Sequence, residues 1–119
     1  MTATDSSGLA QLRDALRQFA ADRDWDQFHS PKNLASALAV EAAELLERFQ
    51  WLTEDQSRHL SAVELGKVRE EMADVLNYLV RLADKLDVDL IAAARAKIQL
   101  NAVKYPVDQA RGSAKKYSD

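Results

Sequence analysis

Four stretches of this 119-residue chain place apolar side chains at every third or fourth position, the spacing that lines one face of an α-helix. No stretch alternates apolar and polar residues as a half-buried strand does, and only three glycines and two prolines interrupt a chain rich in helix formers. The pattern therefore predicts an all-α fold of the four-helix bundle type. The main helices are expected over about 9–23, 30–51, 61–86 and 89–104.

The expected helix ends carry recognisable signals. Ser30 followed by Pro31 is typical of a helix start, because serine caps the first turn and proline fits its first residue. The segments 53–56 and 61–64 both have the form of a capping box, Thr/Ser-x-x-Gln/Glu. Pro106 should end the last helix, since proline cannot continue it.

The length and composition fit one globular domain over 1–119, since 47% of the residues are apolar and 29% are charged. Residues 1–8 are small and polar, so we expect a frayed lead-in there. Residues 106–119 are expected to form an irregular C-terminal tail.

Several functional classes are excluded by composition. The formal net charge of −3 leaves no basic footprint for a nucleic-acid polymer. The chain has no cysteine, which excludes disulfides and thiolate chemistry. No apolar run approaches the ~20 residues that cross a bilayer, and the first residues lack the basic-then-apolar pattern of a secretion signal. We therefore expect a cytoplasmic protein with no membrane partner.

One glutamate lies inside an apolar stripe of the second expected helix. At about 100° per residue, Glu41 falls in the middle of this stripe and Glu44 on its flank, whereas Glu47 points away. The stripe itself consists of Leu34, Leu38 and Leu45. A charge in such a position is costly unless something pairs with it, so Glu41 needs a cationic partner.

The third expected helix carries a second acidic pair beside its own stripe. Glu71 borders the stripe, Asp74 lies further out on the same side, and Glu70 faces the opposite way. Tyr78 lies on the flank next to Glu71. The stripe consists of Val68, Val75, Leu79, Leu82 and Leu86. Periodicity therefore separates Glu71 from its surface neighbour Glu70.

Each acidic pair has i, i+3 spacing, which makes its two members neighbours on the helix surface. If the two helices pack antiparallel, four carboxylates converge, and they repel one another unless cations neutralise them. Carboxylate oxygens are hard ligands that suit Mg²⁺, with Mn²⁺ as a substitute, and protein-bound Mg²⁺ is usually shared with substrate phosphates. The two pairs therefore predict a metal site for a phosphate ester.

Two other interpretations compete with this metal site. Paired glutamates on helices are most often partners in surface salt bridges, but Glu41 inside one stripe and a second pair beside another count against that. A di-iron bundle needs Glu-x-x-His pairs, and neither His29 nor His59 follows a glutamate by three positions.

The two acidic pairs resemble a family signature. "EAAE" at 41–44 and, about thirty residues later, "EMAD" at 71–74 resemble the E-x-x-E … E-x-x-D motif of the MazG-like all-α nucleoside triphosphate pyrophosphohydrolases. The segments "RDWDQFH", "FQW" and "KYPV…RGSAKKY" extend the resemblance over about 9–119, to the dCTP pyrophosphatase branch of that family. The acidic signature alone is moderately specific, whereas the combination is highly specific.

The resemblance implies a fold completed by dimerisation and an enzyme that cuts a deoxynucleoside triphosphate between its α and β phosphates. The substrate would be dCTP or a modified dCTP, the cofactor Mg²⁺, and the role the removal of unwanted nucleotides from the pool. The metal ligands that it implies are Glu41, Glu44, Glu71 and Asp74. We expect Glu41 or Glu44 to act as the base that holds the attacking water.

The resemblance also implies substrate contacts outside the acidic pairs. They comprise Trp25, Asp26, Gln27, Phe28, His29, Trp51, Tyr78, Lys97, Asn101 and Lys104. Trp25 and Trp51 offer flat faces on which a base can stack. Lys97 and Lys104 lie on the outer face of their helix, so they would serve the site of a neighbouring subunit.

At two positions the chain departs from the family. Leu16 stands where the first helix often has a polar residue that reaches the substrate, and Asn77 replaces a usual apolar residue beside the acidic pair. Both departures concern the base preference rather than the reaction. A pyrophosphohydrolase of broad specificity is therefore an alternative.

Assembly is the last expectation. The long apolar third helix needs cover, and the family forms intimate dimers that commonly pair into tetramers. We therefore expect a homo-oligomer, a dimer or a tetramer. A catalytically silent helical assembly module is the remaining alternative, and the intact set of four acids counts against it.

Overall fold

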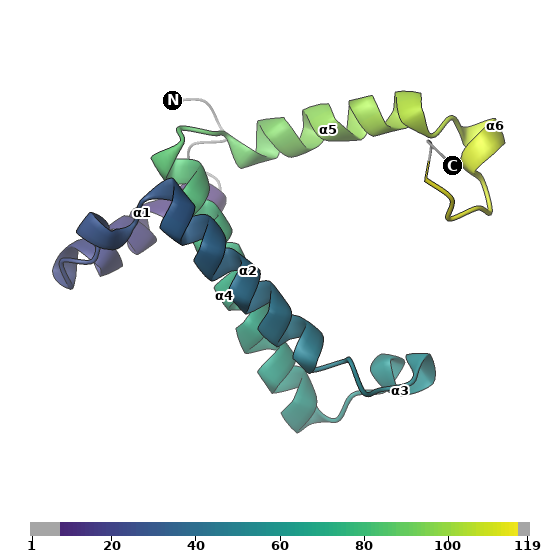
Figure 1. The fold of residues 1–119 in the computed structure, drawn as a ribbon, viewed down its shortest axis with the longest axis horizontal. Coiled ribbons are helices and arrows are strands. Elements are labelled where there is room, and N and C mark those ends of the chain that lie inside the picture. The colour runs from purple at the N-terminus through teal and green to yellow at the C-terminus, as the bar shows by residue number, and fades with distance from the viewer. Residues whose placement is uncertain (1–7, 117–119) are drawn as a thin grey trace. The chain divides into compact units, whose positions relative to one another are not determined.

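The computed structural model describes residues 8–116, and all regular structure in that range is helical (Figure 1). The elements in chain order are α1 (Gly8–Asp22), η2 (Asp26–Phe28), α2 (Pro31–Glu47), α3 (Glu54–Arg58), α4 (Ala62–Lys85), α5 (Leu90–Lys104) and α6 (Val107–Ala110). The all-α prediction and its four long helices are confirmed. The contacts divide the chain into two units, with the division between Asp87 and Val88.

The first unit is built on the pairing of α2 with α4, which lie side by side (Figure 1). Helix α1 packs on the C-terminal half of α4, where Arg17 reaches Asp84. The buried apolar side chains of this unit are Ala10, Ala20, Leu34, Val68, Val80 and Ala83. Two helix pairs thus share α4, which holds the unit together.

The helix starts carry the predicted N-cap residues, but of the two predicted capping boxes only the one at 53–56 is complete, and at 61–64 only the Ser61 half is present. The Ser30 hydroxyl accepts a hydrogen bond from the Asn33 N–H at 3.1 Å, and Ser61 caps α4 in the same way. Thr53 and Gln56 form the complete capping box that opens α3. Each cap satisfies an N–H that the first helical turn leaves without a backbone partner.

Helix α2 ends at Glu47, before the expected end at about Trp51, so that boundary prediction is wrong. Past the helix, the Phe49 N–H bonds to the Leu46 carbonyl and the Leu52 N–H bonds to the Phe49 carbonyl, both three residues back. Such tight turns replace the last helical turn because the chain must become extended by the next helix cap.

The tail beyond Pro106 is not irregular throughout, because α6 occupies Val107–Ala110. Proline fixes its own φ near the helical value, and the N–H groups of Gln109 and Ala110 bond to the Pro106 carbonyl at 3.0 and 2.8 Å. Pro106 therefore ends one helix and begins another. Residues 1–7 and 117–119 lie outside the described residues.

The burial along α4 differs from the expected stripe near its C-terminal end. Leu86, expected in the stripe, is 54% exposed, whereas Val80 and Ala83 are buried. Since α4 packs against both α1 and α2, its C-terminal half buries more than one face. A single-stripe prediction cannot capture a helix with two partners.

The second unit consists of α5 and α6. Asp89 caps α5 by accepting a hydrogen bond from the Ala92 N–H at 3.0 Å. No side chain between 88 and 116 is buried, and large apolar ones are open to solvent: Val88, Ile98, Leu100, Val103 and Val107. Over the described range 8–116, no helix is both long enough and apolar enough to pass through a bilayer. The prediction of one domain over 1–119 stays a prediction.

Candidate functional site

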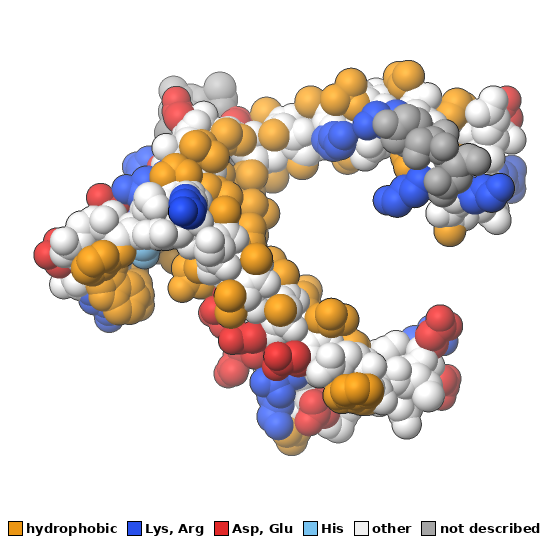
Figure 2. Space-filling view, in the orientation of Figure 1, with side chains coloured by type: hydrophobic (Ala, Val, Ile, Leu, Met, Phe, Trp, Pro, Cys, Tyr) orange, Lys and Arg blue, Asp and Glu red, His pale blue; other side chains and the backbone are white. Residues whose placement is uncertain are grey.

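Three carboxylates converge where α2 lies against α4. Glu41 and Glu44 of α2 and Glu71 of α4 each offer one oxygen, and these oxygens all lie within 4.8 Å of one another. Figure 2 shows the acidic side chains gathered along this helix pair. The predicted meeting of acidic residues from the two helices therefore occurs for three of the four.

The surroundings of Glu41 in this cluster raise its pKa to about 7. Loss of hydration is the largest cause, followed by a hydrogen bond to Glu44 and by the negative charges of Glu44, Asp74 and Glu71. A proton on Glu41 relieves part of the repulsion, because it is shared with Glu44. The cluster thus holds a proton or a cation near neutral pH.

Two carboxylate oxygens of the cluster have no hydrogen-bond partner although they are buried: Glu41 Oε2 and Glu71 Oε2. Buried polar atoms are nearly always paired, so each of these oxygens has room for a proton, a water molecule or a cation as its partner. Hard oxygens at such spacing are the donors that Mg²⁺ and Mn²⁺ prefer. The donor set therefore fits a divalent cation.

Asp74, the fourth predicted ligand, lies outside the group of three and is exposed. Its charge still acts on Glu41, and its side chain lines the cavity beside the cluster. It lies one helical turn from Glu71 on α4. Asp74 thus lies between the acidic cluster and the cavity.

An arginine already occupies part of the acidic cluster. A guanidinium nitrogen of Arg48 lies 3.4 Å from Glu71 Oε1, while the buried Arg48 Nε has no hydrogen-bond partner. One ion pair of this length cannot balance three carboxylates. Arg48 is therefore an incomplete internal counter-ion, located where a metal would compete with it.

An open cavity of about 360 Å³ adjoins the cluster. Its walls come from α1, the segment around η2, and α4. Its lining residues are Ala15, Leu16, Phe19, Ala20, Trp25, His29, Asp74, Asn77, Tyr78 and Arg81. Apolar side chains from α1 thus face polar side chains from α4, a mixture typical of small-molecule sites.

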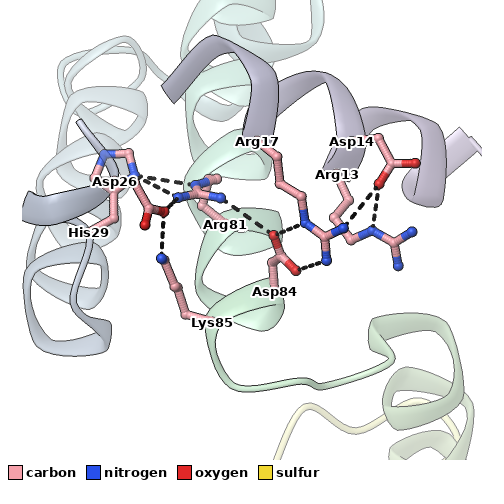
Figure 3. Close-up of polar contacts among 8 residues, drawn as sticks. All are labelled: Arg13, Asp14, Arg17, Asp26, His29, Arg81, Asp84 and Lys85. Carbon is pink, nitrogen blue, oxygen red and sulfur yellow. Dashed lines mark hydrogen bonds and ion pairs between the residues drawn. The ribbon is translucent and has the colours of Figure 1, made fainter. Parts of the chain in front are cut away.

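A network of charges fixes the η2 segment against α4 (Figure 3). Asp26 accepts hydrogen bonds from Lys85 at 2.5 Å and from Arg81 at 2.9 Å. These bonds, the one from Lys85 first, lower the pKa of Asp26. Arg81 itself is only 5% exposed, so its charge depends on these partners.

The same arginine orients His29. Arg81 lies 3.0 Å from His29 Nδ1, which accepts its hydrogen bond when the imidazole is neutral. Burial, and then the charge of Arg81, lower the pKa of His29, so the neutral form is favoured. The ring that enters the cavity is therefore uncharged at neutral pH.

Helix α1 is attached to the same network. Arg17 donates two hydrogen bonds to Asp84, at 2.7 and 2.5 Å, and Arg81 lies 3.4 Å from the same carboxylate. The hydrogen bond from Arg17 is the main cause that lowers the pKa of Asp84. Three of the elements around the cavity are thus held by one chain of ion pairs (Figure 3).

The cavity brings together some of the expected substrate residues. Trp25, His29 and Tyr78 line it. The others within the η2 segment have structural contacts or face outward: Asp26 binds Arg81 and Lys85, Gln27 donates to Asp24, and Phe28 is 60% exposed.

The remaining expected substrate residues lie elsewhere. Trp51 is 87% exposed and does not line the cavity. Lys97, Asn101 and Lys104 lie on α5, in the second unit. Their roles in substrate binding stay predictions.

Sequence reasoning missed the part played by Arg81 and Arg48. The spacing Asp74, Asn77/Tyr78, Arg81 follows one face of α4 and would have predicted Arg81 beside the site. Arg48, four residues after Glu44, is also in position to neighbour that carboxylate. Phe19 had no comparable signal, because its spacing only predicts a helix face.

The fold and the site define an all-α protein with a carboxylate cluster suited to a divalent cation. The chain belongs to the MazG-like family, whose model matches residues 37–119. That match contains both acidic pairs.

The relatives that resemble this chain along most of its length have pyrophosphatase names. The chain is 46% identical to dCTP pyrophosphatase 1 of Mus musculus and 43% identical to dCTP pyrophosphatase 1 of Homo sapiens, in each case over 93% of its own length. It spans 66% of each relative. A solved pyrophosphatase of Archaeoglobus fulgidus is 42% identical, with a TM-score of 0.79 over 84% of this chain and 94% of that one.

The raised pKa of Glu41 predicts a pH dependence of stability in the metal-free protein. The folded pKa is about 7 against an ordinary value of 4.5, so the unfolded chain loses this proton first as the pH rises. The contribution of Glu41 to stability is therefore fully present below about pH 4.5 and is lost as the pH rises through 7. In EDTA, the Tm of the wild type should fall more between pH 5 and pH 8 than that of Glu41→Gln.

The control is Glu47→Gln, which removes an exposed carboxylate of the same helix and should retain the wild-type fall. Added Mg²⁺ should restore the wild-type Tm at pH 8, because a cation replaces the proton. Parallel curves for the wild type and Glu41→Gln would contradict this account of the cluster.

The contact between Arg48 and Glu71 predicts competition with metal. Arg48→Leu removes a positive charge from the cluster, so Mn²⁺ should bind more tightly, by up to about fivefold, the range expected for a partly exposed ion pair. Isothermal titration of the metal-free protein measures this. Arg58→Leu, which removes the partner of Glu54 on α3, should leave the affinity unchanged. Weaker Mn²⁺ binding in Arg48→Leu would show that Arg48 assists the metal.

Proposed function

We propose that this chain is a Mg²⁺-dependent nucleoside triphosphate pyrophosphohydrolase that converts dCTP, or a modified dCTP, to the monophosphate and pyrophosphate. The named relatives are dCTP pyrophosphatases at 43–46% identity, and the solved neighbour is a pyrophosphatase. The reaction would serve to remove unwanted nucleotides from the pool.

One observation carries the proposal. An acidic cluster with two unpartnered buried oxygens lies next to a cavity whose aromatic and polar lining suits a nucleoside. Glu41 Oε2 and Glu71 Oε2 need a cation, and the cavity provides an aromatic wall at Trp25 and Tyr78. Asp74 lines the cavity, and its charge acts on Glu41 of the cluster. A metal-bound triphosphate at the cluster would therefore extend its nucleoside into the cavity.

Glu41, Glu44 and Glu71 would hold the cation, with Asp74 completing the set from the cavity side. A bound Mg²⁺ supplies neutralisation of phosphate charge and a water molecule of lowered pKa. The chain itself supplies the fixed acids, whose mutual repulsion is relieved on binding. Mn²⁺ has the same ligand preference and should substitute.

The bonds change at the α phosphorus. The oxygen of a water molecule forms a bond to this phosphorus, and the bond from the phosphorus to the oxygen that bridges to the β phosphorus breaks. The electron pair of the broken bond leaves on pyrophosphate. One proton of the water passes to a carboxylate oxygen of Glu41 or Glu44, and the other remains on the monophosphate.

The neighbouring residues would hold the nucleoside. Trp25 provides a flat face for base stacking, which is worth about 1–3 kcal/mol per base in single-strand binders. His29, neutral and held by Arg81, offers its other ring nitrogen to the ligand. Trp51 would meet the substrate only if another part of the assembly brings them together.

We also propose that the chain works as a homo-oligomer, a dimer or a tetramer, in the cytoplasm. The described part of the second unit has no buried side chain, and Ile98, Val103 and Val107 are 63%, 79% and 77% exposed. Apolar surface of this kind needs cover. A second copy would supply it, and would allow Lys97 and Lys104 to serve a neighbouring site.

Product analysis tests the proposed reaction. The purified protein is incubated with Mg²⁺ and a panel of dNTPs and NTPs, and the products are resolved by anion-exchange chromatography. We expect dCMP and pyrophosphate from dCTP, and much less from the other nucleotides. Release of inorganic phosphate with a diphosphate, or no turnover of any nucleotide, would rule out the proposal. Equal turnover of many bases would instead favour a broad-specificity enzyme.

Matched glutamates provide the residue controls for this assay. Glu44→Ala and Asp74→Ala should each lower kcat by at least about 100-fold, because each removes a ligand or a base. Glu47→Ala and Glu70→Ala, exposed neighbours on the same helices, should stay within about twofold. Similar losses of kcat in all four variants would refute the assignment of Glu44 and Asp74 to the site and of Glu47 and Glu70 to the outer helix faces.

A further inference from the structure

The polar side chains of the cavity are not equally available to a ligand. Besides Asp74 at the acidic side, they are His29, Asn77, Tyr78 and Arg81. The guanidinium of Arg81 already contacts Asp26, Asp84 and His29. Its contact with His29 occupies the Nδ1 atom of the histidine ring. Asn77 and Tyr78 therefore remain as uncharged groups on α4 that can bind a substrate.

Asn77 is a half-buried amide without an assigned task. Within residues 8–116 its side chain makes no hydrogen bond and no ion pair. A ligand that displaces water from this amide must supply its hydrogen bonds, because an unpaired amide removed from water costs about 1–3 kcal/mol. Because the group faces a cavity, a ligand can provide the missing bonds.

The position of Asn77 along α4 fits a base rather than a phosphate. It lies three residues after Asp74, which borders the acidic cluster, and four residues before Arg81. On a helix these separations are about 4.5 and 6 Å along the axis. Asn77 thus lies about one turn along α4 from Asp74, on the side away from the acidic cluster, and lines the same cavity as side chains of α1.

The surroundings of Asn77 make its amide selective. Leu16, Phe19 and Ala20 of α1 line the same cavity and offer no side-chain hydrogen bonds. A flat ring held among these apolar groups and Trp25 can satisfy its own polar edge only through the few polar side chains present. A hydrogen bond made in such a place discriminates strongly against ligands that lack its partner.

We propose that Asn77 is a specificity-determining residue that hydrogen-bonds to the pairing edge of the nucleotide base. For cytosine, Asn77 Oδ1 accepts a hydrogen bond from the 4-amino group, and Nδ2 donates to ring nitrogen N3. An amide is suited to this task because it presents one donor and one acceptor side by side. This inference rests on the proposed function, since it names the group that reads the base of that substrate.

The experiment removes the proposed hydrogen bond first from the substrate, by omitting the 4-amino group of the base, and then from the protein, by replacing Asn77. It compares kcat/KM for dCTP with kcat/KM for the triphosphate of the 2-pyrimidinone deoxynucleoside, in which hydrogen replaces the 4-amino group. In the wild type the ratio should be about 10 or more, as expected for one good paired contact. In Asn77→Leu, which keeps the branched shape without the amide, the ratio should fall to about 1.

Further variants make the comparison independent of folding defects. Asn77→Ala adds no bulk and should give the same ratio of about 1 as Asn77→Leu. Asn77→Asp keeps an acceptor for the 4-amino group, so its ratio should be higher than that of Asn77→Leu. Gln18→Met removes an amide from α1 that binds Asp22 outside the cavity, and should keep the wild-type ratio.

Two results separate this inference from the proposed function. If Asn77→Leu and Asn77→Ala keep the wild-type ratio, Asn77 does not read the base, although the enzyme activity stands. If the wild type releases no pyrophosphate from either nucleotide, the proposed function fails, and the inference falls with it.

Discussion

Repulsion among carboxylates is the constraint on which the site depends. The pairing of α2 with α4 brings Glu41, Glu44 and Glu71 within 4.8 Å of one another, and this pairing also forms the centre of the first unit. The fold therefore places like charges together at a cost that a proton, Arg48 or a metal must offset. A cluster with unpartnered buried oxygens binds a divalent cation more readily than a site built for stability alone, because cation binding removes an existing penalty.

The cavity depends on a second set of charges that serves a different purpose. Asp26 and Asp84 are both paired with cations, and Arg81 connects them across the inner end of the cavity. Each of these two carboxylates has a cationic partner within the chain, so the network fixes the η2 segment without demanding a metal ion. The contrast distinguishes the two acidic regions. The carboxylates of one are paired with cations of the chain and hold the η2 segment against α4, whereas the other keeps two buried oxygens without a partner. Rigid walls beside a charged cluster suit a substrate with an aromatic end and a phosphate end.

Periodicity and caps in the sequence were sufficient for the helices and for the acidic pairs. Glu41 inside an apolar stripe indicated the site, because local spacing alone determines which residues share a helix face. The shortened end of α2 and the helix α6 were not predictable in the same way, since they depend on how turns join successive helices. Arg81 and the cavity walls depend on packing between α1 and α4, which a single sequence without long-range contacts does not specify. In the sequence Asn77 stands out only as a departure from the apolar residue usual in the family, and the structure shows that it lines the cavity.

The most direct test of the central claim locates the cation. Crystals grown with Mn²⁺ are measured at the manganese absorption edge, where anomalous scattering identifies the metal. The account predicts an anomalous peak among Glu41, Glu44 and Glu71, about 2.0–2.3 Å from their oxygens, with Arg48 displaced from Glu71. A cluster without an anomalous peak at saturating Mn²⁺, with Arg48 still paired to Glu71, would contradict it.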